Sequence, residues 1–169
     1  MIKLDGEPVN GVRLKEVFGC FPSGVTAVSA LIDGEPVGMA ASSFTAVSLD
    51  PPLVSVCMQV TSQTWRKLRS QHRLGVSVLS QAQGHACRSL ASPEGDRFDG
   101  VAWDVTADGA VLIEGATAWL NCGIHTVVPA GDHAIVLLRV HELLGNVSVE
   151  PLVFHRSRFR ALVSVQGTA

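Results

Sequence analysis

The sequence predicts a mainly β fold, in which antiparallel strands form a closed or nearly closed barrel with a few short peripheral helices. Three observations lead to this fold class: most apolar segments are short and rich in β-branched residues, turn-forming residues separate them, and two late segments alternate with period two. No GxGxxG motif follows a predicted strand, which disfavours a dinucleotide-binding α/β fold. With 169 residues, we expect a single domain over residues 1–169.

The first elements are predicted to be a short helix and a β-hairpin. Apolar residues recur at helical spacing over 11–19, and this segment ends at a glycine, as helices often do. Residues 25–32 are mostly β-branched or small and apolar, and Asp33 with Gly34 supplies a hairpin turn. We therefore expect this strand to fold back onto a second strand over 36–41.

Strands and helices then alternate through the middle of the chain. Residues 53–59 and 74–79 are apolar enough for two further strands, and a helix predicted over 61–71 crosses between them. Hydroxyl residues can cap the start of this helix, and basic residues in its second half suit the negative end of the helix dipole. Another helix is expected over 81–90, before the polar loop 92–100.

The last predicted strands show the period of two most clearly. In 118–125 and again in 134–140, apolar residues occupy every second position. Side chains on a strand point alternately to its two faces, so this pattern places one set inward and the other outward. Such strands complete the predicted antiparallel barrel.

Composition and charge exclude several classes of function. A net charge of −2 and a pI near 6.3 give no basic surface for nucleic acid. No apolar run approaches the roughly 18 residues of a membrane span, and the N-terminal segment is too acidic for a secretory signal, so we expect no membrane association and a cytoplasmic location. The four cysteines form no CxxC pair and the six histidines no HExxH motif. We therefore expect buried free thiols and no metal site.

The apolar content predicts an oligomer. Apolar residues make up 47% of the chain before its 16 glycines are counted, and charged residues only 17%. The usual shares are about 45–50% with glycine included and about 25%. A chain of this size cannot bury so much apolar surface alone, so we expect a homodimer with two-fold symmetry.

Two polar segments are candidate sites for a flat, phosphorylated ligand. Small Ala40 and Ala41 would let a ring lie against the backbone, and Ser42 and Ser43 could hydrogen-bond its carbonyls and nitrogens. The TSQT motif at 61–64 places hydroxyls at a helix N-terminus, which suits a phosphate. A core strand with a Ser/Thr-rich turn and an ordinary N-cap explain the same residues.

The order of the motifs separates these alternatives. FPSGVTAVSA, GMAASSFTAVSLDPPLVSVCMQ, TSQTW, DRFDG, AGDH and PLVFHRSRF follow one another along the chain. Over roughly residues 11–162, they closely resemble the flavin reductase family of FMN-binding split barrels. The resemblance implies an antiparallel split β-barrel and an NAD(P)H-dependent flavin reductase. Such an enzyme passes hydride from C4 of reduced nicotinamide to N5 of FMN or FAD, and supplies reduced flavin to a partner flavin-dependent oxygenase.

The resemblance also implies roles for individual residues. Met39, Ala40, Ala41, Ser42 and Ser43 would line the flavin ring and ribityl chain, and Cys57, Met58 and Gln59 would face the ring from the next strand. Ser62 and Thr64 would hold the phosphate. Arg97 and Phe98 would approach the cofactor, from the same subunit or from its partner.

The resemblance implies a nicotinamide site as well. The GDH element ends at His133, which would be the catalytic residue that positions or polarises the dinucleotide, and Phe154 and Arg156 would also contact it. The C-terminal motif reads FHRSRF where the family usually reads like YYRGRY, with His155 and Ser157 replacing an aromatic residue and a glycine. The choice between NADH and NADPH therefore stays open.

Two other functions remain compatible with parts of the sequence. The altered C-terminal motif also suits a flavin-binding carrier or sensor module without nicotinamide turnover. A split-barrel oxidase acting on a phosphorylated pyridine ring is disfavoured, because its phosphate site is usually richer in Arg and Lys. FMN and FAD differ only beyond the phosphate they share, so the sequence does not distinguish these two flavins. It also does not distinguish a firmly held prosthetic flavin from a flavin that binds as a substrate.

Overall fold

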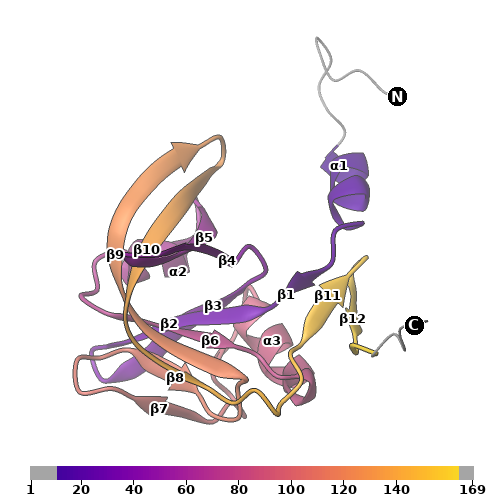
Figure 1. Cartoon of the computed structure of the whole chain (residues 1–169). Coiled ribbons are helices and arrows are strands. Elements are labelled where there is room, and N and C mark those ends of the chain that lie inside the picture. The colour runs from indigo at the N-terminus through magenta and orange to yellow at the C-terminus, as the bar shows by residue number, and fades with distance from the viewer. Residues whose placement is uncertain (1–10, 164–169) are drawn as a thin grey trace.

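A computed structural model describes residues 11–163 (Figure 1). The elements in chain order are α1 (Gly11–Phe18), β1 (Ser23–Gly24), β2 (Thr26–Ile32), β3 (Glu35–Ala41), β4 (Thr45–Leu49), β5 (Pro52–Gln59), α2 (Gln63–Leu68), β6 (Leu74–Val78), the 3₁₀ helix η1 (Gln81–Gln83), α3 (Gly84–Ala91), β7 (Trp103–Val105), β8 (Val111–Ile113), β9 (Ala118–Ala130), β10 (His133–Gly145), β11 (Val153–His155) and β12 (Arg158–Arg160). None of the helices in this range is long and apolar enough to cross a membrane.

Most strands form one curved antiparallel sheet in the order β3-β2-β6-β9-β10-β5-β4. The long hairpin of β9 and β10 is paired from Ala130 with His133 to Ala118 with Gly145. Within residues 11–163, no strand pairing joins the two edge strands β3 and β4. The mainly β class predicted from the sequence is confirmed, and the sheet is open between these two edges.

Two apolar clusters lie on opposite faces of this sheet. The first includes Val56, Met58, Trp65 and Leu138, and it fills the inner face closed by α2. The second packs α3 and β8 against the outer face of β2 and β3, and includes Leu90. Because β3 contributes to both clusters, successive residues of β3 face different surroundings.

The predicted hairpin over 25–41 is confirmed. Strand β2 pairs with β3 from Thr26 opposite Ala41 to Ile32 opposite Glu35. The turn between them has φ of 54° at Asp33 and 85° at Gly34, the two positive values that a type I′ turn requires.

The cysteines are free but not all buried. Cys87 and Cys122 lie in the core, whereas Cys57 is half-buried and Cys20 is exposed. The expectation of four buried thiols was therefore wrong for Cys20, which follows α1 outside both clusters, and it holds only in part for Cys57. Burial raises the pKa of the Cys122 thiol to about 12 and also raises the pKa of Cys87.

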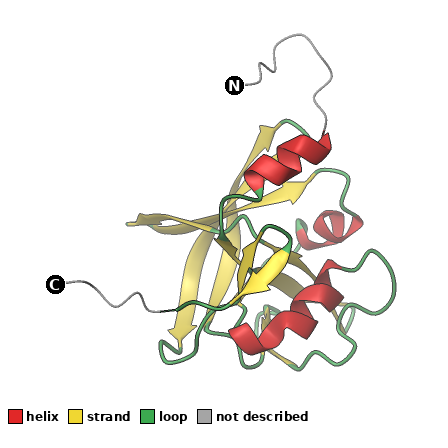
Figure 2. Cartoon of the chain, turned by 90° about the vertical axis from the view of Figure 1, so that its right-hand side faces the viewer, coloured by secondary structure: helices red, strands yellow, loops and turns green. Residues whose placement is uncertain are grey.

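The two ends of the described chain form an arm beside the sheet, made of residues 11–24 and 153–160. Strand β1 pairs with β11, and the Arg156 amide donates to the Gly19 carbonyl at 3.1 Å. The arm extends to the right in Figure 1 and faces the viewer in Figure 2. Phe18 and Phe21 are 68% and 77% exposed, so the arm presents large apolar side chains that the rest of residues 11–163 leaves uncovered.

Candidate functional site

A cavity of about 250 Å³ lies between β3, α2 and the loop that contains residues 95–98. Its walls are residues 36–38 of β3, Gln63, Thr64 and Lys67 of α2, and residues 95–98 of the loop. A guanidinium, an ammonium, a hydroxyl and an amide thus converge on one space. These are the donors that a phosphate group accepts hydrogen bonds from.

Arg97 is fixed within this cavity. Its Nη1 donates to Thr64 Oγ1 at 2.8 Å and to the Gly38 carbonyl at 3.3 Å. The other guanidinium N–H groups stay available, since arginine has five donors. Thr64 accepts from Arg97, so its own hydroxyl hydrogen can point to a ligand.

Gly38 allows the loop to approach β3 this closely. A Cβ at this position would lie 2.8 Å from Ser29 Oγ and 3.0 Å from the Phe98 ring. Phe98 is buried in the second apolar cluster, and its amide donates to Asp96 Oδ1 at 2.8 Å. The loop is therefore anchored by Phe98, which leaves the neighbouring Arg97 directed at β3.

Ser43 connects the loop after β3 to β5. Its Oγ accepts from the Cys57 amide at 2.8 Å and donates to the Cys57 carbonyl at 3.3 Å. The Ser43 hydroxyl is thus engaged by its own chain, whereas Ser42 is exposed. Ser62 is also engaged, because its Oγ caps α2 by accepting from the Trp65 amide at 3.2 Å. Among the predicted hydroxyls, Thr64 is the one that lines the cavity.

Met58 needs a correction among the residues predicted to face the ring. Its side chain is 0% exposed and lies in the inner cluster with Val56. Cys57 and Gln59 point to the opposite face of β5, since alternate side chains change face. Only the backbone of Met58 could reach a ligand on that face. Ala41 is buried on the inner face as well, beside the half-buried Met39.

His133 stands next to Gln59 at the start of β10. The two residues are paired across the β5–β10 ladder, and Asp132 lies in the turn just before them. His133 Nδ1 is 2.7 Å from Asp132 Oδ1, and this interaction holds the pKa of the Asp132 carboxyl below its usual value. Nε2 is the ring nitrogen left for a ligand. The structure therefore brings His133 to the outer face of β5 that carries Cys57 and Gln59.

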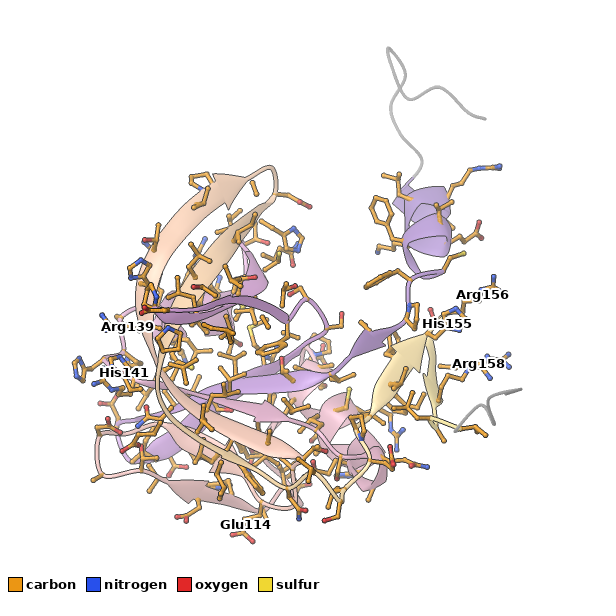
Figure 3. All side chains as sticks on the ribbon, in the orientation of Figure 1. Glu114, Arg139, His141, His155, Arg156 and Arg158 are labelled. Carbon is orange, nitrogen blue, oxygen red and sulfur yellow. The ribbon has the colours of Figure 1, made fainter. Side chains whose placement is uncertain are left out.

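Phe154 and Arg156 lie in the arm, not beside His133. Figure 3 shows Arg156 and His155 at the right, on the arm, whereas Figure 1 shows the turn between β9 and β10 at the top of the sheet, away from the arm. Phe154 packs edge-to-face on Phe159 at 5.9 Å between ring centroids. Arg156 and Ser157 have φ of 50° and 59°, a turn conformation in which glycine is the preferred residue. Within one chain, these two predicted nicotinamide contacts are separate from His133.

Residues 18–163 match the model of a protein family described as flavin reductase like domain. The chain belongs to this family. It is 38% identical to a flavin reductase of Pseudomonas putida over 152 residues. This alignment covers 89% of each protein. It is also 33% identical over 156 residues to the reductase subunit of a flavin-dependent monooxygenase from Rhodococcus jostii, covering 92% of this chain and 80% of that one.

Solved structures of flavin reductases show the same fold. The NADH:FAD oxidoreductase of Streptomyces globisporus, determined with NAD and FAD fragments, superposes with a TM-score of 0.88 at 39% identity. That comparison covers 96% of this chain and 100% of the Streptomyces chain. The recognition of a flavin reductase from the motif order is thereby confirmed.

Sequence reasoning missed three groups of cavity residues in this flavin reductase: Gln63 and Lys67 of α2, Pro36 and Val37 of β3, and Gly95 and Asp96 of the loop. The helical spacing of Thr64 and Lys67 was an available signal, because residues three apart lie on one face of a helix. No sequence signal placed Pro36 and Val37 opposite them.

Thiol labelling offers a test of the ring face. In a Cys20→Ser background, Cys57 is expected to be the reactive thiol at pH 8, because Cys87 and Cys122 are buried with raised pKa values. Saturating flavin should slow the reaction of Cys57 with a coloured disulfide reagent. An unchanged labelling rate with bound flavin would contradict the placement of the ring over β5. Labelling in denaturant gives the total number of thiols, against which the native reaction is compared.

Proposed function

We propose that this chain is an NAD(P)H:flavin oxidoreductase that binds flavin along β3, β5 and α2. The observation that carries the proposal is the convergence of Arg97 and Thr64 on one cavity, with the outer face of β5 leading to His133. When bound, the flavin would accept at N5 the hydride that C4 of reduced nicotinamide donates. The relative from Streptomyces globisporus is named an NADH-dependent FAD reductase, which favours NADH as the donor.

The residues of the chain supply binding and orientation in this proposal. Arg97 and Thr64 hold the phosphate, and Ser43 fixes the loop after β3 against Cys57. His133 orients the nicotinamide, with Asp132 holding Nδ1 so that Nε2 faces the dinucleotide. Hydride transfer between two rings depends on alignment and on exclusion of water, so no nucleophile or general base is required.

Reductase activity is favoured over a carrier or sensor. Relatives matching most of this chain are named reductases or reductase subunits of monooxygenases. We therefore propose a flavin-dependent oxygenase component as the partner that receives reduced flavin. The four free cysteines are compatible with the proposed cytoplasmic location, since disulfides are rare there.

We also propose a homodimer of single-domain split β-barrels. The edge strands β3 and β4 of the curved sheet would be the opening of the split barrel. The exposed Phe18 and Phe21 of the arm form an apolar patch of the kind that marks a protein interface. A second copy covering this patch would also bring a second arm, with Phe154 and Arg156, to the molecule.

The function is tested by mixing purified protein with flavin and NADH and following nicotinamide absorbance. We expect flavin-dependent NADH oxidation. His133→Ala should lower kcat/KM for NADH by about three- to tenfold, the loss of one polar contact, with little change in flavin affinity. His125→Ala is a matched control, because His125 is exposed on β9 of the same hairpin. No oxidation with either NADH or NADPH would refute the proposed function, and equal effects of the two variants would refute the role of His133.

A further inference from the structure

The cavity continues beyond the position proposed for the flavin phosphate. Successive contacts run backwards along β3: Ser43 bonds to Cys57, Ser62 Oγ lies 4.0 Å from Met39 Sδ, and Arg97 bridges Thr64 and Gly38. If the flavin ring lies over β5 near His133, these contacts lead from the ring to the phosphate at Arg97 and Thr64. Residues 36–37 and Lys67 follow next along β3 and α2, so these walls lie further from the ring than the phosphate does.

The volume of the cavity exceeds what one phosphate needs. A cavity needs about 10–15 Å³ of such volume to hold one water molecule, and this cavity offers about 250 Å³, so it has room for more than the oxygens of one phosphate. Yet it is smaller than the roughly 300 Å³ at which sites for whole drug-sized ligands begin. The cavity therefore suits a phosphate and a further polar fragment, with the flavin ring over β5 outside it.

The charges are arranged for two phosphate groups. Arg97 is held at the Gly38 side by its hydrogen bonds, and Lys67 lies one helical turn after Thr64 on α2. Among the described residues, the Lys67 ammonium makes no ion pair or hydrogen bond. Asp96, the carboxylate in the cavity wall, accepts a bond from the Phe98 amide. The Arg97 guanidinium is thus held in position beside Thr64, and the Lys67 ammonium, further along α2, is available to a ligand.

Charge alone would not separate the two flavins. The terminal phosphate of FMN carries about −1.5 to −2 at pH 7, similar to the two single charges of the FAD pyrophosphate. Placement would separate them, because FMN would end at the phosphate held by Arg97 and Thr64. Only FAD would extend to Lys67 and to the half-buried Pro36 and Val37, against which a sugar or adenine can pack.

We infer that this chain selects FAD over FMN, and that Lys67 with the wall at Pro36 and Val37 binds the adenosine diphosphate end of FAD. This inference rests on the proposed function, because it assigns the far end of the same flavin site. Lys67 is then a specificity-determining residue, separate from the groups that hold the phosphate shared by both flavins.

The test measures dissociation constants of oxidised FAD, FMN and riboflavin without NADH, by quenching of flavin fluorescence. The unmodified protein should bind FAD about tenfold more tightly than FMN. Lys67→Gln should weaken FAD about fivefold, as expected for one solvent-accessible charged contact, and FMN less than twofold. Arg69→Gln removes an exposed cation that does not line the cavity and should change neither. Added ADP should displace FAD but not riboflavin.

The outcomes separate the inference from the proposed function. Equal affinity for FMN and FAD, equal weakening of both by Lys67→Gln, or displacement of riboflavin by ADP would overturn the inference. If NADH still reduces all three flavins, the proposed function stands without it. If none of the three flavins binds or is reduced, the proposed function itself fails. Lys67 is exposed, so the variant is expected to fold.

Discussion

Arg97→Met is expected to weaken flavin binding by about ten- to hundredfold, because hydrogen bonds to charged groups contribute about 1.5–3 kcal/mol. Arg97 is the group that links the loop, β3 and α2 through its bonds to Gly38 and Thr64. Its loss removes a cation and also the positioning of the Thr64 hydroxyl. FMN and FAD should be affected alike, since both carry the phosphate proposed to lie here, and titration of flavin fluorescence measures the change.

The conservative variant and a matched control sharpen this prediction. Arg97→Lys keeps the charge but loses the guanidinium donors that remain for a phosphate while Nη1 bonds to Thr64 and Gly38, so we expect an intermediate loss. Arg88→Met removes the same charge on α3, where Arg88 lies 5.5 Å over the Phe159 ring, and should leave flavin affinity within about twofold. Unchanged flavin affinity in Arg97→Met would show that the phosphate lies elsewhere.

The elements predicted best from sequence have local signals. The hairpin over 25–41 was predicted because Asp33 and Gly34 suit the positive φ values that the turn adopts. The alternation after residue 118 predicted β9 and β10, although both strands are longer than the alternating segments. The segments that the alternation did not cover, residues 126–130 of β9 and residues 141–145 of β10, are exposed throughout, so their sequence has no period to detect.

Other elements lacked such signals. Strand β4 was missed because its Thr and Ser residues, in TAVSL, were interpreted as part of the Ser/Thr-rich turn that follows the strand over 36–41. Strands β7 and β8 have three residues each, too short for a period. The buried position of Met58, in contrast, followed from the alternation of Val54, Val56 and Met58, a signal that the family resemblance overrode.

The site itself was predictable only in pieces. Its cavity joins residues 36–38, 63–67 and 95–98, segments far apart in the chain whose contact depends on the whole sheet. Motif order predicted Thr64 and Arg97 as site residues without indicating that they bond to each other. The position of Phe154 and Arg156 in the arm likewise follows from the pairing of β1 with β11, which no local pattern encodes.

Gly75→Ala is expected to cost the largest amount of stability of any substitution considered for this chain. A Cβ built on Gly75 would overlap the carbonyl oxygen of Val111, a backbone atom of β8 that no side-chain rotation can move away. Strand β8 is held to β6 by the Ile113 amide, which donates to the buried Ser77 Oγ at 2.9 Å. Relief of the overlap requires β8 to shift, which weakens this bond and the packing of the second apolar cluster.

We expect a loss of about 3 kcal/mol, the upper part of the range for overpacked cores, and a decrease in Tm of about 6–12 °C for a chain of this size. Thermal unfolding followed by circular dichroism measures this decrease in Tm.

Gly145→Ala is the matched control, since Gly145 also lies in a strand and a Cβ there would meet no atom within 4 Å. The Tm of this control variant should stay within about 2 °C of the parent. Because Gly75, Ser77 and the residues of β8 do not line the cavity, a destabilised Gly75→Ala protein should still bind flavin below its Tm. A Tm equal to that of Gly145→Ala would mean that β8 does not pack on β6 as described.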